Sequence, residues 1–297
     1  MPQKIKKAII AVAGSGTRLL PATKSMPKEM LPIVDTPIIH LVVEELVAAG
    51  IEDIIFVMRW DKKPLEDYFD HSTALEEELM SKGNDRPEHD NRYKKLAEEI
   101  KYIADMANFI YVRQKGPYGN GTPVLSAASL VDDEPFVFVF GDDLVKSKVS
   151  FTKQMVEDYE KSSSLVIGVQ EVPKEDVVKY GIVKLKKGSS ELEDIIEKPS
   201  VEEAPSQLAV FGRYILNQEI IDILRETKLG KDNELWITDA IRKYVKKGGK
   251  FVAKEIEDGE WLTTGDPLNY LKATFAYAMD REDINVELKS FIDSQHK

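Results

Sequence analysis

The chain has 297 residues, of which 42% are hydrophobic and 31% charged, so it can form a sizeable core and is not a wholly disordered protein. Its formal net charge of −11 argues against a nucleic-acid partner, because phosphate backbones are bound by basic surfaces. The absence of cysteine excludes disulfides, thiol nucleophiles and thiolate metal sites, and it fits a cytoplasmic location.

Apolar, β-branched runs, mostly bounded by turn residues, predict strands along the chain. They lie at Lys7–Ala13, Asp53–Met58, Phe109–Arg113, Pro135–Phe140, Leu165–Val169, Gly181–Leu185, Leu208–Leu216 and Lys250–Ile256. Between many of these runs, apolar residues recur with the 3.6-residue period of a helix, as over Ile38–Gly50, Gln218–Thr227 and Trp236–Lys247. This alternation predicts an α/β fold with a Rossmann-like mixed, mostly parallel sheet that has helices on both faces.

Two segments differ from this alternation. Residues 68–106 are rich in charge and predict a solvated helical insertion of two surface helices around a polar loop at Gly83–Asn91. Residues Gly265–Ser294 predict one or two amphipathic helices near the C-terminus. The run Ala8–Ala13 is too short for a signal peptide or an anchor, and no segment approaches the roughly 18 apolar residues that span a bilayer, so we expect no membrane partner.

A glycine-rich turn, Gly14-Ser15-Gly16-Thr17-Arg18, directly follows the first predicted strand. At a helix N-terminus, such a turn exposes backbone N–H groups that can bind an anion. A dinucleotide fingerprint would need a third glycine where Leu19 stands, and the Gly-Lys-Ser/Thr run of a Walker loop is absent. Arg18, together with Lys28 ten residues later, can supply positive charge for a triphosphate, so we interpret the turn as a phosphate site.

These motifs and those that follow resemble the sugar-1-phosphate nucleotidylyltransferases, and among them the bacterial enzymes that use UTP and glucose 1-phosphate. The matching runs are Ala13–Arg18, Pro21–Pro32, Arg113–Lys115, Gly141–Asp143, Tyr180–Val183, Ile196–Pro199, Gly212–Tyr214 and Thr238–Ile241. They occur in order over nearly the whole chain. The resemblance implies transfer of a uridylyl group from UTP to glucose 1-phosphate with release of pyrophosphate, with Mg²⁺ as cofactor. We also expect a homo-oligomer.

We expect the chain to be divided as follows. Residues 1–264 would form the nucleotidylyltransferase domain, including the insertion at 68–106 and a smaller sugar-binding subregion at 150–230. Residues 265–297 would form a separate C-terminal helical segment.

The reaction of this family needs no general base, because the attacking phosphate oxygen is already ionised near neutral pH. Catalysis must therefore come from positioning and charge neutralisation during an in-line displacement at the α-phosphate. The resemblance assigns catalysis to Arg18 and Lys28, nucleotide binding to Gly14, Gly16, Thr17, Gln114 and Gly119, sugar-phosphate binding to Gly181, Glu197 and Lys198, and the metal to Asp142.

Residue chemistry agrees with several of these assignments. Asp142 follows a buried strand at its carboxyl end, where open α/β sheets bind their ligands, and a carboxylate there can hold Mg²⁺. The alternative is that Asp142 and Asp143 form a polar turn that caps a helix, and the resemblance places Asp143 near the sugar. The amide of Gln114 can read a pyrimidine edge, while Glu197 and Lys198 can bind sugar hydroxyls and a phosphate unless they are an ordinary surface ion pair.

Two regions depart from the family pattern. Relatives usually carry Glu, Leu and Leu where this chain has Gly116, Tyr118 and Asn120, and His-Ala in place of Thr122-Pro123. Many relatives have a second metal-binding aspartate where this chain has Thr263. Asp266 could replace that aspartate, but we favour a role as the N-cap of a helix that starts at Pro267.

Other functions remain open at this stage. The substrates could be dTTP, or UTP with another sugar phosphate. A non-catalytic paralogue that binds nucleotide sugars is a third hypothesis, which the presence of Lys28, Asp142 and Lys198 disfavours.

Overall fold

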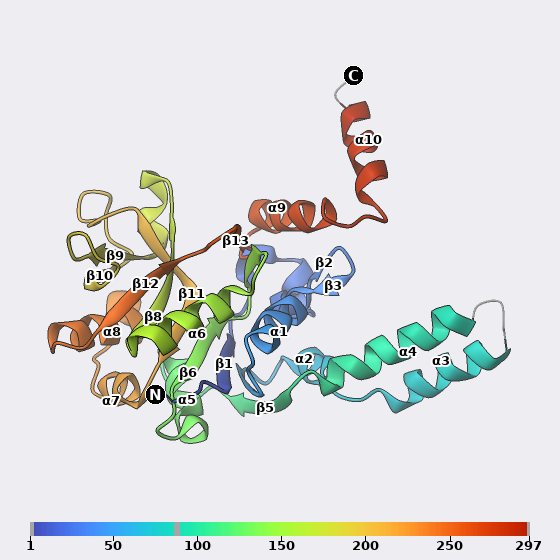
Figure 1. The fold of residues 1–297 in the computed structure, drawn as a ribbon, viewed down its shortest axis with the longest axis horizontal. Coiled ribbons are helices and arrows are strands. Elements are labelled where there is room, and N and C mark those ends of the chain that lie inside the picture. Colours follow the sequence, from blue (N-terminus) through green and yellow to red (C-terminus); the bar gives the residue numbers. More distant parts are fainter. Residues whose placement is uncertain (1–2, 86–89, 296–297) are drawn as a thin grey trace.

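The computed structural model describes residues 3–85 and 90–295 and has a nine-stranded mixed sheet at its centre (Figure 1). Seven strands lie in the order β10-β9-β11-β6-β1-β4-β5, and β8 pairs with both β11 and β12. The strands are β1 (Lys7–Val12), β4 (Asp53–Met58), β5 (Asn108–Arg113), β6 (Phe136–Phe140), β8 (Leu165–Glu171), β9 (Gly181–Leu185), β10 (Leu192–Glu197), β11 (Leu208–Leu216) and β12 (Phe251–Glu255). The predicted α/β fold is confirmed.

Helices cover both faces of this sheet. The α-helices of the described residues are α1 (Ile38–Ala48), α2 (Lys63–Tyr68), α3 (Thr73–Asp85), α4 (Asp90–Asp105), α5 (Thr122–Val131), α6 (Phe151–Ser162), α7 (Gln218–Arg225), α8 (Ile237–Lys246), α9 (Pro267–Ala278) and α10 (Asn285–Gln295), and α1, α5, α6, α7 and α8 are those that pack on the sheet. Side chains of β1 alternate between the two faces: Ile10 packs in the core beside α1 and α6, and Ile9 in the core beside α5, α7 and α8.

The four strands β5, β4, β1 and β6 are parallel, with Ile9 paired to Ile55 on one side and to Phe138 on the other. Strands β1, β4 and β6 are buried on both faces, which explains why their sequences are nearly continuous apolar runs, whereas β5 lies at the sheet edge and is partly exposed. Beyond β6, β11 runs antiparallel and joins the strands of the second half of the chain to the same sheet. The carboxyl ends of β1 and β6 therefore lie next to the sugar-binding half predicted from the sequence.

The glycine turn does not lead into an α-helix, so the expectation of a helix N-terminus there is wrong. The chain instead forms three short 3-10 turns over Thr17–Leu19, Ala22–Lys24 and Lys28–Met30. Prolines at positions 21 and 27 lie between these turns, and proline lacks the backbone N–H that a continuing helix needs.

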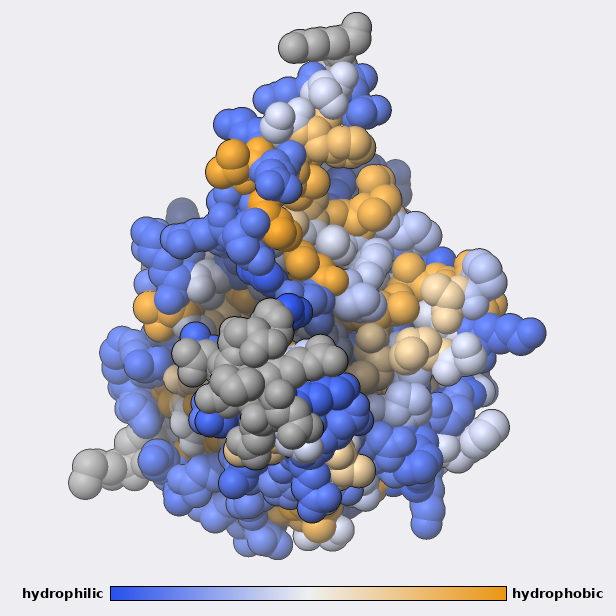
Figure 2. Space-filling view, turned by 90° about the vertical axis from the view of Figure 1, so that its right-hand side faces the viewer, coloured by the Kyte–Doolittle hydropathy of each residue, from blue (hydrophilic) through white to orange (hydrophobic). Residues whose placement is uncertain are grey.

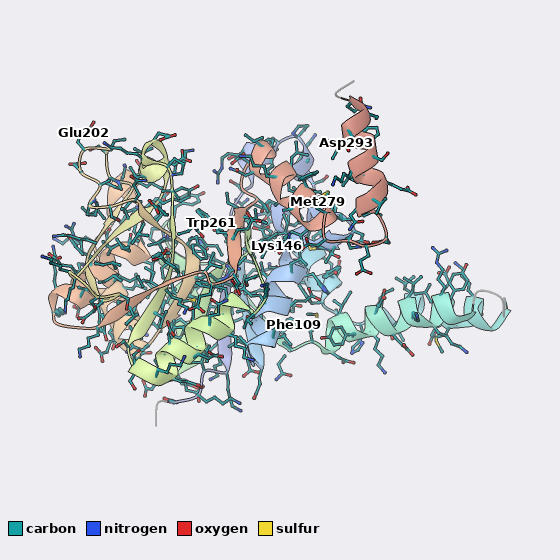
Figure 3. All side chains as sticks on the ribbon, turned by 45° about the horizontal axis from the view of Figure 1, so that its top comes forward. Phe109, Lys146, Glu202, Trp261, Met279 and Asp293 are labelled. Atoms are coloured by element: carbon teal, nitrogen blue, oxygen red, sulfur yellow. The ribbon has the colours of Figure 1, made fainter. Side chains whose placement is uncertain are left out.

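A second small sheet forms beside the first. Strand β7 (Asp143–Ser147) pairs antiparallel with β13 (Gly259–Thr263), which places Thr263 opposite Asp143. The residues after Asp142 are thus a strand, and the helix-cap alternative for Asp142 and Asp143 is wrong. Lys146 of β7 also donates to the carbonyl of Ala276 in α9 at 2.8 Å, so this sheet anchors the C-terminal helices (Figure 3).

Two helical projections extend from the body (Figure 1). One is formed by α3 and α4 within residues 68–106; Asp85 and Asp90 are already helical, and residues 86–89 of the expected loop lie outside the described residues. The other is formed by α10, which follows α9 at the C-terminal end of the chain. Within residues 3–85 and 90–295, no helix has the length and apolar character needed to cross a membrane.

Helix α9 begins with the N-cap expected from the sequence. The Asp266 carboxylate accepts a hydrogen bond from the backbone N–H of Asn269 at 3.1 Å, and a second from the Asn269 side-chain amide at 2.6 Å. Pro267 occupies the first turn, where no backbone N–H is required.

We expect Asp266→Ala to lower the free energy of unfolding by about 1 kcal/mol, because the first turn of α9 loses its cap. Asp266→Asn should retain most of the stability, since an asparagine oxygen also accepts from the N3 backbone N–H. Urea denaturation of the three proteins measures the difference. Equal loss in both variants would show that charge, rather than capping, is what this position contributes.

Candidate active site

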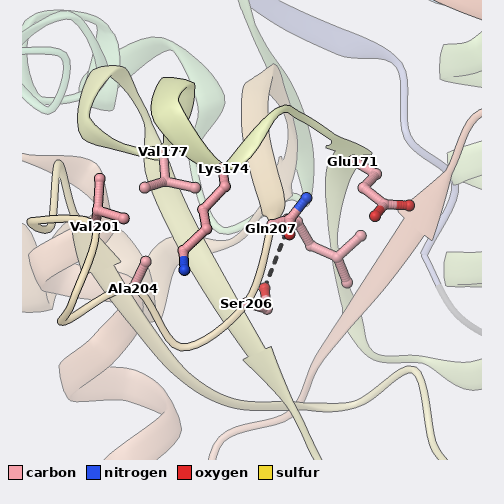
Figure 4. Close-up of a pocket in the computed structure, with 8 residues that line it drawn as sticks. Glu171, Lys174, Val177, Val201, Ala204, Ser206 and Gln207 are labelled. Atoms are coloured by element: carbon pink, nitrogen blue, oxygen red, sulfur yellow. Dashed lines mark hydrogen bonds between the residues drawn. The ribbon is translucent and has the colours of Figure 1, made fainter.

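A cleft of about 700 Å³ lies at the carboxyl ends of β1 and β6 and brings together residues from both halves of the chain. Nine of the predicted site residues line it: Gly14, Arg18, Lys28, Gln114, Gly119, Asp142, Gly181, Glu197 and Lys198. Gly16 and Thr17 do not belong to its lining. A smaller hollow of about 500 Å³ near Lys174 and Ser206 contains none of the predicted site residues (Figure 4).

Lys28 and Asp142 form an ion pair in the cleft. Burial alone would lower the pKa of Lys28, but the Asp142 and Glu29 carboxylates raise it above the ordinary value, so the amine stays charged. Burial opposes ionisation of Asp142, yet Lys28 holds the pKa of that carboxyl below its usual value. The Lys28 ammonium passes 3.4 Å from where a Cβ on Gly14 would lie, which is why glycine suits that position.

A second, fully buried ion pair stands behind Lys28. Lys62, in the loop before α2, donates to Glu29 at 2.8 Å, and Glu29 has no exposed surface. Glu29 belongs to the 3-10 turn that carries Lys28. Moving this turn away from Lys62 would leave a buried charge uncompensated, so the pair fixes the turn. It was not predicted from the sequence, since Glu29 and Lys62 are 33 residues apart.

The other residues of the glycine turn have distinct roles. Gly16 adopts a φ of 65°, and its carbonyl accepts a hydrogen bond from the Thr23 hydroxyl at 2.8 Å, so it shapes the turn without lining the cleft. The Arg18 guanidinium lies 2.9 Å from where a Cβ on Gly265 would lie. Gly265, from the last third of the chain, thus leaves room for Arg18.

Arg213 holds the turn that carries Asp142. Its guanidinium is fully buried, donates to both carboxylate oxygens of Glu45 on α1, and donates to the carbonyl of Asp143 at 2.7 Å. It also donates to the carbonyl of Phe140, at the end of β6, at 3.4 Å. The hydroxyl of Thr152 on α6 donates to Glu45 at 2.6 Å. Arg213 therefore binds the carbonyls of Phe140 before the corner between β6 and β7 and of Asp143 after it, which fixes this corner.

Asp143 lies in the cleft beside Asp142. Burial and the neighbouring Asp142 charge raise the pKa of Asp143 to about 6, although Trp261 donates its indole N–H to this carboxylate at 2.9 Å. Trp261 in turn stacks on Phe211. Thr263 and Asp266 also line the cleft, and the Asp266 carboxylate is engaged as the cap of α9.

The loop Gly116–Gly121 contains Gly119, which was predicted to bind the nucleotide, and is called the base loop below. It packs against a segment that is distant in the sequence. Gly119 has a φ of 116°, and a Cβ there would lie 2.2 Å from the carbonyl oxygen of Leu235. The Asn120 side chain accepts a hydrogen bond from the backbone N–H of Ile237 at 2.8 Å. Glycine at 119 is thus required by this packing, whatever it contacts in a ligand.

Glu197 and Lys198 line the opposite end of the cleft. The Thr238 hydroxyl donates to Glu197 at 2.9 Å, and burial raises the pKa of this carboxyl despite that hydrogen bond. A Cβ on Gly181 would lie 2.9 Å from the Thr238 methyl group, so glycine permits this approach. The two residues do not pair with each other within the part of the chain that the structure describes, so the surface ion-pair alternative is wrong.

Several lining residues were not predicted from the sequence. They include Tyr118, Tyr214, Trp236, Thr238 and Trp261. Trp236 directly precedes α8, and Thr238 belongs to a run recognised as a motif, but nothing local in the sequence indicates that either side chain faces the cleft.

The chain is similar to known proteins over nearly its whole length. A family model for nucleotidyl transferases matches residues 7–279. The UTP–glucose-1-phosphate uridylyltransferase of Staphylococcus epidermidis is 43% identical over 98% of each chain, and the UTP–glucose-1-phosphate uridylyltransferase YngB of Bacillus subtilis is 40% identical over 99% of this chain and 96% of its own. A UDP-glucose pyrophosphorylase complexed with UDP-glucose superposes with a TM-score of 0.80 at 40% identity, covering 93% of this chain and 100% of that one. The UTP-bound enzyme of Acinetobacter baumannii superposes with a TM-score of 0.85 at 37% identity, covering 97% and 98%.

We expect Arg213→Met to lower the free energy of unfolding by about 3–5 kcal/mol, because Glu45 stays buried without its cation. The double variant Glu45→Leu with Arg213→Met should recover part of that loss, since apolar replacement of a buried pair is often tolerated. Hydrogen exchange at the amides after Asp142 should be faster than in the wild type in both variants, because the carbonyl of Asp143 has lost its donor. Wild-type exchange there in the double variant would contradict the assigned role of Arg213.

Proposed function

Because the chain belongs to the nucleotidyl transferase family, we propose that it is the enzyme that transfers the uridylyl group of UTP to glucose 1-phosphate, giving UDP-glucose and pyrophosphate. The observation that carries the proposal is the single cleft that holds the glycine turn, Lys28 and Asp142 at one end and Glu197 and Lys198 at the other. A cleft of this volume can hold a nucleotide and a sugar phosphate together. The cytoplasm, where UTP is available, is the expected location.

In the proposed reaction, an ionised phosphate oxygen of glucose 1-phosphate forms a bond to the α-phosphorus of UTP. The bond between that phosphorus and the oxygen bridging to the β-phosphorus breaks, and pyrophosphate leaves with that electron pair. No proton needs to move, so the protein acts by positioning both substrates and by neutralising charge. Lys28 and Arg18 would face the triphosphate, and Lys198 the sugar phosphate.

The donor set of the cleft fits Mg²⁺ carried in by the nucleotide. Among the described residues, no three His, Cys, Asp or Glu side chains gather as a complete metal site. Asp142 supplies one carboxylate next to the neutral Thr263 hydroxyl and Asp143, and Mg²⁺ is commonly held by one or two carboxylates together with phosphate oxygens and waters. Asp142 would hold the cation, which when bound neutralises charge on the phosphates.

The expected homo-oligomer stays a prediction. Apolar side chains stand exposed on the C-terminal helices, and one face of the molecule shows such side chains gathered there (Figure 2). They are Leu268, Leu271, Phe275, Val286 and Phe291. A second copy that covered them would account for their exposure.

We expect pyrophosphate release only when UTP, glucose 1-phosphate and a divalent cation are all present. A coupled pyrophosphate assay with the four nucleotides and several sugar phosphates, including galactose 1-phosphate and N-acetylglucosamine 1-phosphate, measures this directly. Removal of the cation with EDTA should stop release, and excess Mg²⁺ should restore it. Faster turnover with dTTP, or binding of UDP-glucose without any turnover, would contradict the proposed function.

Lys28 and Lys198 should affect different substrates, because they lie at opposite ends of the cleft. We expect Lys28→Ala mainly to lower kcat with UTP, and Lys198→Ala mainly to raise KM for glucose 1-phosphate. Each change should amount to roughly one to two decades, since each removes one charged contact. Steady-state kinetics with each substrate varied in turn tests this, and loss of UTP affinity alone in both variants would overturn the assignment.

A further inference from the structure

The Lys198 side chain lies against an uncharged aromatic ring in the cleft. Its ammonium lies 4.1 Å from the centre of the Trp236 ring. Its backbone is fixed on both sides, because its N–H donates to the carbonyl of Tyr180 at 2.9 Å and its carbonyl accepts from the Lys231 ammonium at 2.7 Å. An aromatic face attracts a cation without supplying a full negative charge, so Lys198 stays available to a phosphate. Lys28, in contrast, is paired with a carboxylate.

Trp236 is itself fixed by its own segment and by the predicted base loop. Its indole N–H donates to the carbonyl of Lys231 at 2.9 Å, and little of the side chain is exposed. The residue before it, Leu235, exchanges two backbone hydrogen bonds with the base loop: its N–H donates to Tyr118 at 2.8 Å, and its carbonyl accepts from Gly121 at 2.9 Å.

Asn120 adds a side-chain link on the other side of Trp236. The backbone N–H of Ile237 begins α8 and is buried, and Trp236 cannot cap it. The Asn120 oxygen accepts this hydrogen bond at 2.8 Å from 117 residues away in the sequence. Asn120 is also one of the positions at which the base loop departs from the family pattern.

We propose that Trp236 is a positioning residue that holds the Lys198 ammonium in the sugar-phosphate site, and that Asn120 of the base loop in turn holds Trp236. The inference rests on the proposed function for the identity of the two substrates. Its consequence is that a residue on the nucleotide side of the cleft determines affinity on the sugar-phosphate side.

The first test measures glucose 1-phosphate binding by calorimetry, with the non-reacting analogue α,β-methylene-UTP and Mg²⁺ present. Trp236→Leu should weaken glucose 1-phosphate binding roughly threefold to thirtyfold, because the ring that orients Lys198 is gone. Trp236→Phe keeps an aromatic face and should recover much of the affinity. Binding of the UTP analogue should change less than that of glucose 1-phosphate in both variants.

The second test uses Asn120. Asn120→Ala leaves the buried N–H of Ile237 without an acceptor and should weaken glucose 1-phosphate binding roughly threefold to tenfold. Asn120→Asp retains an acceptor oxygen and is the matched control, which should bind nearly as wild type. An equal effect of Asn120→Ala on both ligands would instead indicate general damage to the base loop and would contradict the proposal.

A double-mutant cycle shows whether Trp236 acts through Lys198. In the Trp236→Leu background, Lys198→Met should have a clearly smaller effect on glucose 1-phosphate binding than it has in the wild type. Full additivity, or unchanged binding in Trp236→Leu, would overturn the proposal. A wild-type protein that binds glucose 1-phosphate but forms no UDP-glucose would overturn the proposed function alone, and one that binds neither substrate would overturn both.

Discussion

The buried guanidinium of Arg213 is the interaction on which the geometry of the cleft depends. It joins α1 through Glu45, the end of β6 through Phe140 and the start of β7 through Asp143, while lying on β11 itself. A buried cation is stable only when its hydrogen-bonding positions are satisfied, so these elements can pack in only one arrangement around it. That arrangement leaves Asp142 at the corner, facing Lys28.

The two ends of the cleft hold their cations in different ways. Lys28 is kept by a carboxylate and by the buried Glu29–Lys62 pair behind it, whereas Lys198 rests on the face of Trp236. A reaction between two polyanions needs positive charge at both ends, and it needs that charge placed before the substrates arrive. Antiparallel pairing of β6 with β11 joins the parallel strands to β9 and β10, and Glu197 ends β10. The two groups of residues therefore line one cleft.

The sequence predicts the parts whose signal is local. The bounds of β4, β9 and β11 agree with the apolar runs, because these strands are bounded by clear turn residues or changes in polarity. Strands β10 and β13 were not predicted, because their short runs mix charged and apolar residues. The pairing partner of β13 is also distant in the chain, whereas β10 pairs with the preceding strand β9. Lys28, Asp142, Glu197 and Lys198 were found through ordered motifs. Trp236, Asn120 and Lys62 were not, because their contacts join segments that are distant in sequence.

The proposed reaction is a single direct displacement, since the cleft supplies charge and position and the reaction needs no protein nucleophile. The stereochemical course at phosphorus tests this most directly. With one diastereomer of UTPαS and glucose 1-phosphate as substrates, the configuration of the UDP-glucose thio-product can be read by ³¹P NMR. One in-line displacement predicts inversion at the α-phosphorus, whereas retention would require two displacements through a covalent intermediate and would contradict the account.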